Sequence, residues 1–169
     1  MDQSVENKTE IKDKLVNFYN NNKLKIFIII FILLVSVLAF YLLKQNQIKQ
    51  NNLIAEQYIK AGIYLTSNKK DDAREIFQNI ILSKNKFYSV LALNQIIEKN
   101  LISDKSKILE YFDSLEKMNH SEEKQDLISL KKALYLIKNS DVKAGKALLE
   151  KLIDKNSELK SIAEDIILK

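Results

Sequence analysis

The sequence predicts an all-α protein in which one transmembrane helix near the N-terminus is followed by an array of helix pairs. The stretch from Ile26 to Leu43 is apolar and carries no charged side chain. Proline is absent and only two glycines occur, so few residues interrupt a helix. Beyond this stretch, apolar residues recur at i, i+3, i+4 and i+7, which is typical of helices with one buried face.

The length of the apolar stretch favours a membrane span. As a helix, residues 26–43 would extend about 27 Å, close to the ~30 Å thickness of the hydrocarbon core of a bilayer. Apolar side chains would surround this helix on every side, whereas a surface helix of a soluble domain has a polar stripe. The residues that represent the predicted span are Ile26, Phe31, Leu34, Val37, Phe40 and Leu43.

An uncleaved signal anchor over residues 25–43 fits better than a cleaved export signal. A secretory signal has an apolar run of about 7–15 residues that ends at a small-x-small cleavage site. Here the leader before the run is long, and "FYLLKQNQ" at the boundary contains no Ala-x-Ala pattern.

The lysines that flank the span favour one orientation. More of them lie within about fifteen residues before the span than after it, which favours a cytoplasmic N-terminus. We therefore expect residues 1–24 to form a cytoplasmic tail and the C-terminal part to lie outside the cytoplasm, although the reverse orientation stays open. The lysines compared are Lys12, Lys14, Lys23 and Lys25 before the span, and Lys44 and Lys49 after it.

Residues 44–52 are a polar continuation, interpreted as a stalk, and seven helical patterns follow. In the second pattern, one face holds Ala73, Phe77 and Ile80, and Asp71 or Asp72 is expected to cap the helix. The third is apolar around much of its circumference, so we expect it to be the most buried. The predicted helices cover residues 53–65, 72–82, 87–99, 123–138 and 141–154, with a fourth that follows the caps in 103–106 and a seventh that starts at 156–157.

Short polar segments separate the last four predicted helices. "SDKS" supplies caps for the fourth, "NHSEE" precedes the fifth, "NSD" leads into the sixth and "NS" starts the seventh. Phe87 at the start of the third helix is expected in the core. The fifth helix aligns four apolar side chains, Leu127, Leu130, Leu134 and Ile137.

Every second helix repeats one short pattern. A small or medium residue is followed four positions later by a large one, at offsets of 35 and then 36 residues, in the pairs Ala73/Phe77, Ile108/Phe112 and Ala144/Leu148. The first residue lets paired helices approach, and the second fills the space beside the next pair. Together with Ala61 in the preceding helix, this period predicts a tetratricopeptide (TPR)-like α-solenoid over residues 53–169, with about three helix pairs and a closing helix.

The layout of tail, span and helix pairs resembles the bacterial membrane-anchored tetratricopeptide-like family that includes the ancillary subunit of the Sec translocon. The matching segments are "KKDDAREIFQNII" (69–81), "SDVKAGKALLEKLI" (140–153) and "SELKSIAEDIIL" (157–168). The tryptophan and proline of the standard repeat are absent. The resemblance implies an inner-membrane protein with a periplasmic array, acting as a scaffold that contacts translocon subunits, periplasmic chaperones or exported chains.

The sequence contains few patterns typical of catalytic, cofactor-binding or metal-binding sites. We therefore expect no enzyme, no cofactor and no metal site. Cysteine is absent, which excludes disulfides and thiolate ligands. The only histidine, His120, lies in a polar turn and is interpreted as exposed; an enzyme that uses it is the rival hypothesis. The net charge of +5 comes from lysines interleaved with acids, which is typical of a solvated surface, so neither nucleic acid nor a small-molecule substrate is expected.

Protein partners are expected, besides the lipid bilayer. Tyr58, Tyr64 and Tyr135 are candidate partner-binding residues, because the inner groove of a solenoid often presents amphipathic aromatic side chains. Two further alternatives are a cytosol-facing adaptor with the same fold and a structural element whose spans pair laterally. Helices that pair within a membrane usually have small residues at the contact, and the span offers only Ser36 and Ala39. Lateral pairing therefore has little support.

Overall fold

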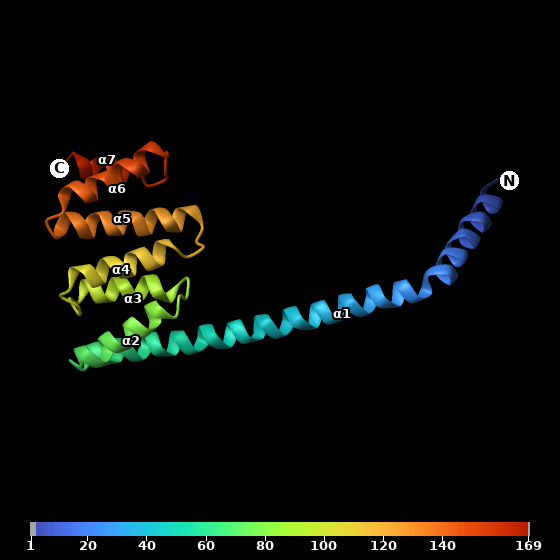
Figure 1. Ribbon diagram of the computed structural model, residues 1–169, viewed down its shortest axis with the longest axis horizontal. Helices are drawn as coiled ribbons and strands as arrows, with labels where there is room; N and C mark the ends of the chain where they lie inside the picture. The colour runs from blue at the N-terminus through green and yellow to red at the C-terminus, as the bar shows by residue number, and fades with distance from the viewer. Residues whose placement is uncertain (1–2, 169) are drawn as a thin grey trace. The chain divides into compact units, whose positions relative to one another are not determined.

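Figure 1 shows a computed structural model, which describes residues 3–168. Residues 1, 2 and 169, which belong to the predicted tail and repeat domain, lie outside the described residues. The described chain contains helices and no strand, so the predicted all-α class is confirmed. The helices are α1 (Gln3–Thr66), α2 (Lys70–Leu82), α3 (Tyr88–Glu98), α4 (Lys105–Glu116), α5 (Glu122–Lys138), α6 (Val142–Asp154) and α7 (Lys160–Ile167).

A single helix, α1, includes residues that the sequence divides into a tail, a span, a stalk and a first array helix. The chain has no proline, and its first glycine is Gly62, so no residue before that point interrupts the hydrogen bonds between turns. Residue contacts nevertheless divide the chain into two compact units between Gln50 and Asn51.

The first unit contains the apolar stretch. This stretch is long and apolar enough to cross a membrane, and none of it is buried within the protein. Ser36 Oγ donates to the carbonyl oxygen of Ile32 at 2.8 Å, so this hydroxyl is satisfied within its own helix. Of the residues that represent the predicted span, one is half-buried (Ile26) and five are exposed (Phe31, Leu34, Val37, Phe40 and Leu43).

In the second unit, α2 to α7 stack in chain order beside the last turns of α1 (Figure 1). Five helices are each followed by a residue whose backbone is in the left-handed region. At the end of α1, for example, Asn68 has φ 60°, and the Lys69 N–H donates back to the Tyr64 carbonyl at 2.8 Å. Such turns usually use glycine, and in this glycine-poor chain other residues replace it. The five residues are Asn68, Lys84, Asn100, Ser140 and Asn156.

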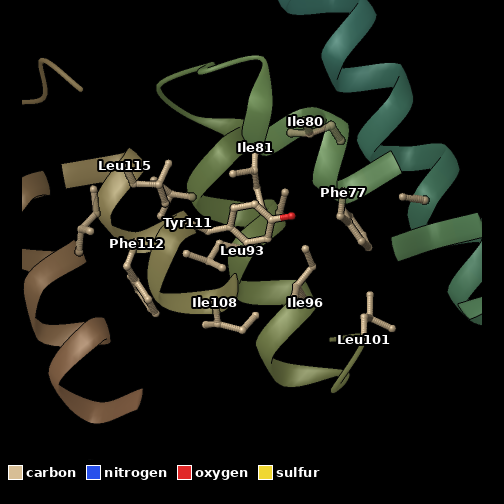
Figure 2. Packing of buried hydrophobic residues seen from close by; sticks show 14 of the residues in the cluster. Phe77, Ile80, Ile81, Leu93, Ile96, Leu101, Ile108, Tyr111, Phe112 and Leu115 are labelled. Atoms are coloured by element: carbon tan, nitrogen blue, oxygen red, sulfur yellow. The ribbon is translucent and has the colours of Figure 1, made fainter. Parts of the chain in front are cut away.

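The second unit has two hydrophobic clusters. The larger joins the end of α1 to α2, α3, α4 and part of α5, and Figure 2 shows Leu93 near the middle of the view, with Phe77 and Phe112 on opposite sides of it. The smaller cluster joins α5, α6 and α7, with Leu149 and Ala163 fully buried. Because α5 contributes to both clusters, it connects the two halves of the unit.

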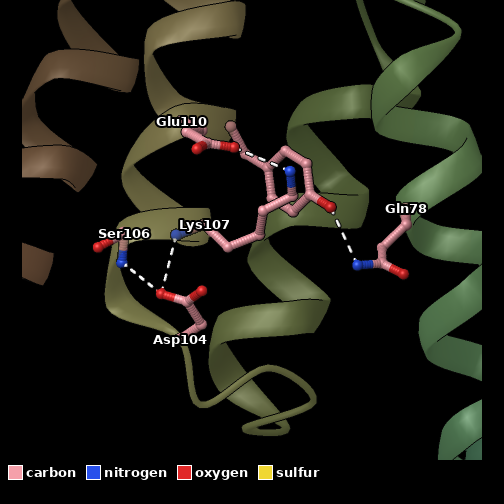
Figure 3. A network of polar contacts seen from close by, with 6 residues as sticks. Gln78, Asp104, Ser106, Lys107 and Glu110 are labelled. Carbon is pink, nitrogen blue, oxygen red and sulfur yellow. Dashed lines mark hydrogen bonds and ion pairs between the residues drawn. The ribbon is translucent and has the colours of Figure 1, made fainter.

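The helix starts agree with the predictions in part. Asp104 caps α4 as predicted, since its carboxylate accepts the N–H groups of Ser106 and Lys107 at 2.9 and 3.3 Å (Figure 3). The prediction for α2 is wrong: Lys69 occupies the N-cap without a side-chain bond. The two expected caps, Asp71 and Asp72, lie inside the first turn, where the helix dipole favours them.

Three apolar residues expected in the core are exposed. Phe87 precedes α3 in a turn, outside the helix whose buried face it was expected to join. Leu127 and Leu134 of α5 are exposed because the helix is buried on two other faces. Ile128 packs into the larger cluster and Ala133 into the smaller one, so the surface between these faces is left to solvent.

A lysine bridge joins α4 to α5. Lys132 Nζ lies 2.7 Å from a carboxylate oxygen of Asp113 and 2.7 Å from one of Glu116. Burial by itself lowers the pKa of this lysine, but its hydrogen bonds to the two carboxylates outweigh that effect and raise the pKa. The bridge therefore holds the two helices together with a charge that persists at neutral pH.

Helix α6 lies close to α5 at Gly145, next to the predicted Ala144. A Cβ atom at Gly145 would lie 2.5 Å from Ile137 Cγ1 and 2.8 Å from the carbonyl oxygen of Ala133. Ala144 itself is only half-buried. Gly62 of α1 contrasts with Gly145, because a Cβ there would meet nothing within 4 Å.

Replacing these two glycines should have opposite effects. Gly145→Ala should destabilise the fold by about 1–3 kcal/mol, because the Ala133 carbonyl belongs to the backbone and cannot move aside cheaply. Gly62→Ala should stabilise it by up to about 1 kcal/mol, because alanine is the better helix former and meets no clash. Chemical denaturation followed by circular dichroism measures both, and equal effects would contradict the packing described.

Candidate interaction surface

The packing residues of the predicted repeat occupy two environments. In the first two pairs they are buried, whereas in the third pair they are half-buried and α6 uses Gly145, Leu149 and Leu152 instead. The buried residues are Ala61, Ala73, Phe77, Ile108 and Phe112, and the half-buried ones are Ala144 and Leu148. The contact between pairs is therefore most regular near the start of the unit.

The three candidate tyrosines are all half-buried. The Tyr58 ring packs against the rings of Phe77 and Tyr88, with centroids 5.6 and 5.7 Å away. Tyr64 lies beneath two ammonium groups, those of Lys60 and Lys69, at 5.6 and 5.7 Å. Each ring thus has one face engaged with the protein.

Tyr135 occupies a similar position on α5. Its ring centroid lies 5.9 Å from that of Phe112. Burial, and to a smaller extent the charge of Asp104, raises the pKa of the Tyr135 hydroxyl, which therefore stays protonated and able to donate a hydrogen bond.

Tyr58 and Tyr135 line cavities on either side of α3. One cavity of about 410 Å³ lies between α1, α2 and α3, with Tyr58, Gly62 and Phe77 in its wall. Two more, of about 270 and 200 Å³, lie between α3 and α5 and share Ile97, Tyr135 and Lys138. We call these three the α3 cavities, because α3 contributes side chains to each.

Lysines dominate the charge around the α3 cavities. Two of them are already engaged: Lys131 Nζ donates to Asn94 Oδ1, and Lys105 Nζ donates to the Asn139 carbonyl, both at 3.1 Å. The charged residues in the three linings are Lys70, Lys99, Lys105, Lys131, Lys138 and a single acid, Glu98. The charge in the three linings is therefore mostly positive. The sequence had not separated these lysines from the other surface lysines.

A fourth cavity, of about 450 Å³, is acidic and lies at the α6–α7 turn, with Glu122, Glu123 and Glu158 in its lining. Its buried carboxylate, Asp126, is bonded to Lys155 Nζ and to Ser157 Oγ. Since both partners belong to the α6–α7 turn, Asp126 ties that turn to α5. The sequence did not predict this role, because an acidic residue within a helix ordinarily faces solvent.

His120 is half-buried in the α4–α5 turn, and the prediction that it is exposed is wrong. Neither ring nitrogen has a hydrogen-bond partner among the described residues. Burial lowers the pKa of His120, and the positive charges of Lys124 and Lys86 lower it further. In the part of the chain that the structure describes, no group of three or more His, Asp and Glu side chains could hold a metal ion.

The lowered pKa of His120 predicts a loss of stability in mild acid. The unfolded chain takes up a proton near pH 6.5, whereas the folded protein resists protonation until a lower pH. Stability should therefore fall as the pH drops below about 6.5. Denaturation midpoints at pH 8 and pH 5.5 should differ less in His120→Gln than in the unsubstituted protein. An identical difference in both would contradict the burial of the imidazole.

Comparisons of this chain with protein-family models, with curated proteins and with solved structures yield no match. Its function is therefore argued from its own residues.

Proposed function

We propose that this chain is a membrane-anchored protein-interaction scaffold, in which a TPR-like α-solenoid is attached to a bilayer by a single transmembrane helix. The exposed apolar stretch of α1 is the observation that carries the proposal. Its side chains find no cover within the described protein, and burial of each large one in lipid is worth about 1.5–3 kcal/mol relative to water. A bilayer supplies that cover.

Several side-chain bonds support the solenoid. Gln78 Nε2 donates to Tyr111 Oη at 3.0 Å across 33 positions (Figure 3), and Lys131 bonds to Asn94 across 37. Asn85 Nδ2 donates to Asn51 Oδ1 across 34 positions. A stack of helix pairs brings equivalent helices side by side, so bonds across about one repeat length are what a solenoid should produce.

The α3 cavities support a role in binding proteins. They are lined mainly by α1, α3 and α5, the first helices of the proposed pairs. Each cavity is small, but together they could hold several side chains of an extended segment. Engagement of Tyr58 and Tyr135 by the core keeps their rings ordered, which reduces the entropy lost on binding.

The family resemblance and the lysines around the span support a location for the protein in the cell. We propose an inner-membrane protein with its solenoid in the periplasm, near the Sec translocon. Translocon subunits, periplasmic chaperones or exported chains would then be the partners. The alternative is a cytosol-facing adaptor with the same fold.

A topology experiment separates these alternatives. Alkaline phosphatase fused after Lys169 should be active, because the enzyme matures only outside the cytoplasm, and the chain should stay in the membrane fraction after carbonate extraction. A fluorescent protein that folds only in the cytoplasm, fused at the same site, is the matched control and should be dark. An inactive phosphatase with a bright control would assign the solenoid to the cytosol, and extraction by carbonate would refute the anchor.

Site-specific crosslinking tests the partner-binding surface. A photoreactive amino acid in place of Tyr135 should crosslink to translocon, chaperone or exported polypeptides. The same amino acid in place of Ile162, which is exposed on α7, is the matched control and should give few products. The same products from both positions would contradict the assignment of binding to the α3 cavities.

A further inference from the structure

The turn between α2 and α3 exposes two large apolar side chains. Leu82, the last residue of α2, is 65% exposed, and Phe87, just before α3, is 56% exposed. Lys84 and Lys86 lie between them and are also exposed. This short turn therefore exposes two large apolar side chains and two ammonium groups together.

Hydrogen bonds hold this turn in one conformation. Asn85 Oδ1 accepts the backbone N–H groups of Phe87 and Tyr88 at 3.0 and 2.9 Å, so it caps α3. Ser83 Oγ accepts the N–H of Asn85 at 3.3 Å. Because the backbone is already fixed, the two apolar side chains are presented outward without a further ordering cost.

A third lysine reinforces the positive charge at the turn. Lys124, at the start of α5, donates from Nζ to the Lys86 carbonyl at 3.1 Å, and its Nζ lies 5.8 Å from the centroid of the Phe87 ring. Within the described residues, Lys84, Lys86 and Lys124 form no ion pair with a carboxylate. The nearby acids Glu122 and Glu123 instead line the cavity at the α6–α7 turn.

The chain keeps this turn within reach of the proposed bilayer. Asn85 Nδ2 donates to Asn51 Oδ1 at 2.7 Å, which attaches the turn to the start of the second unit. Asn51 follows the last residue of the apolar stretch, Leu43, by eight positions. Even a fully extended chain of that length spans only about 29 Å, whatever direction it takes.

We propose that the α2–α3 turn, Leu82 to Phe87, docks on a bilayer surface that contains anionic lipid. Phe87 and Leu82 would enter the boundary between headgroups and acyl chains, and the three lysines would face lipid phosphates, as in other basic-apolar membrane contacts. Each lysine near an anionic surface favours binding about fivefold, so three contribute on the order of 100-fold. This inference rests on the proposed membrane anchor.

Tryptophan fluorescence of the full chain in vesicles tests the proposal, because the protein has no tryptophan of its own. Phe87→Trp should be quenched by brominated lipid in vesicles with about one-third phosphatidylglycerol, several-fold more than in pure phosphatidylcholine. Val142→Trp, exposed at the first residue of α6, is the matched control and should be quenched little in either. Circular dichroism should confirm that both variants fold.

Charge removal gives a second test. The substitutions Lys84→Gln, Lys86→Gln and Lys124→Gln, added to Phe87→Trp, should reduce the quenching to its level in phosphatidylcholine, and 0.5 M salt should do the same by screening. Equal quenching of Phe87→Trp and Val142→Trp, or no dependence on anionic lipid, would overturn the proposal. A blue-shifted Phe87→Trp without lipid quenching would also overturn it, since protein would then cover the turn.

Vesicle flotation separates this result from the anchor. A chain that floats with the vesicles after an alkaline wash retains the proposed anchor, whatever the fluorescence shows. Flotation without quenching therefore overturns the docked turn alone, whereas failure to float overturns the anchor on which it rests.

Discussion

Close contact between helices at small residues is the constraint on which the second unit depends. Gly145 lies against the backbone of α5, and Ala61 and Ala73 are fully buried in the larger cluster. The large side chains of Phe77 and Phe112 are buried in the larger cluster and fill much of its interior.

The turns add a second constraint. Residues with left-handed backbone follow the ends of five helices. The side-chain oxygens of Asn85, Asp104 and Asp126 then accept hydrogen bonds that fix the start of the next helix or hold the next turn in place. Such short connections keep successive helices adjacent in space. They also place the α2–α3 and α4–α5 turns together, which brings Lys86 and Lys124 beside Phe87.

Helix positions were predictable because apolar periodicity is a local property of the chain. The bounds of α2, α3, α5 and α6 lie within about two residues of those expected, and the segment that contains the cap Asp104 was recognised from its residue types. The burial of α5 was not predictable in the same way. A single stripe of leucines suggested one buried face, but α5 has two packed neighbours, and Leu127 and Leu134 lie on the surface between them.

The sequence by itself determined that the chain is helical and that one stretch is apolar enough for a bilayer, because composition and periodicity act over neighbouring residues. Only the tertiary structure decided that Phe87 is exposed, that His120 is half-buried and that lysines surround the α3 cavities. These properties depend on which helices meet, and residues far apart in the chain set them. A pattern within one helix does not indicate which of its surfaces a second helix will cover.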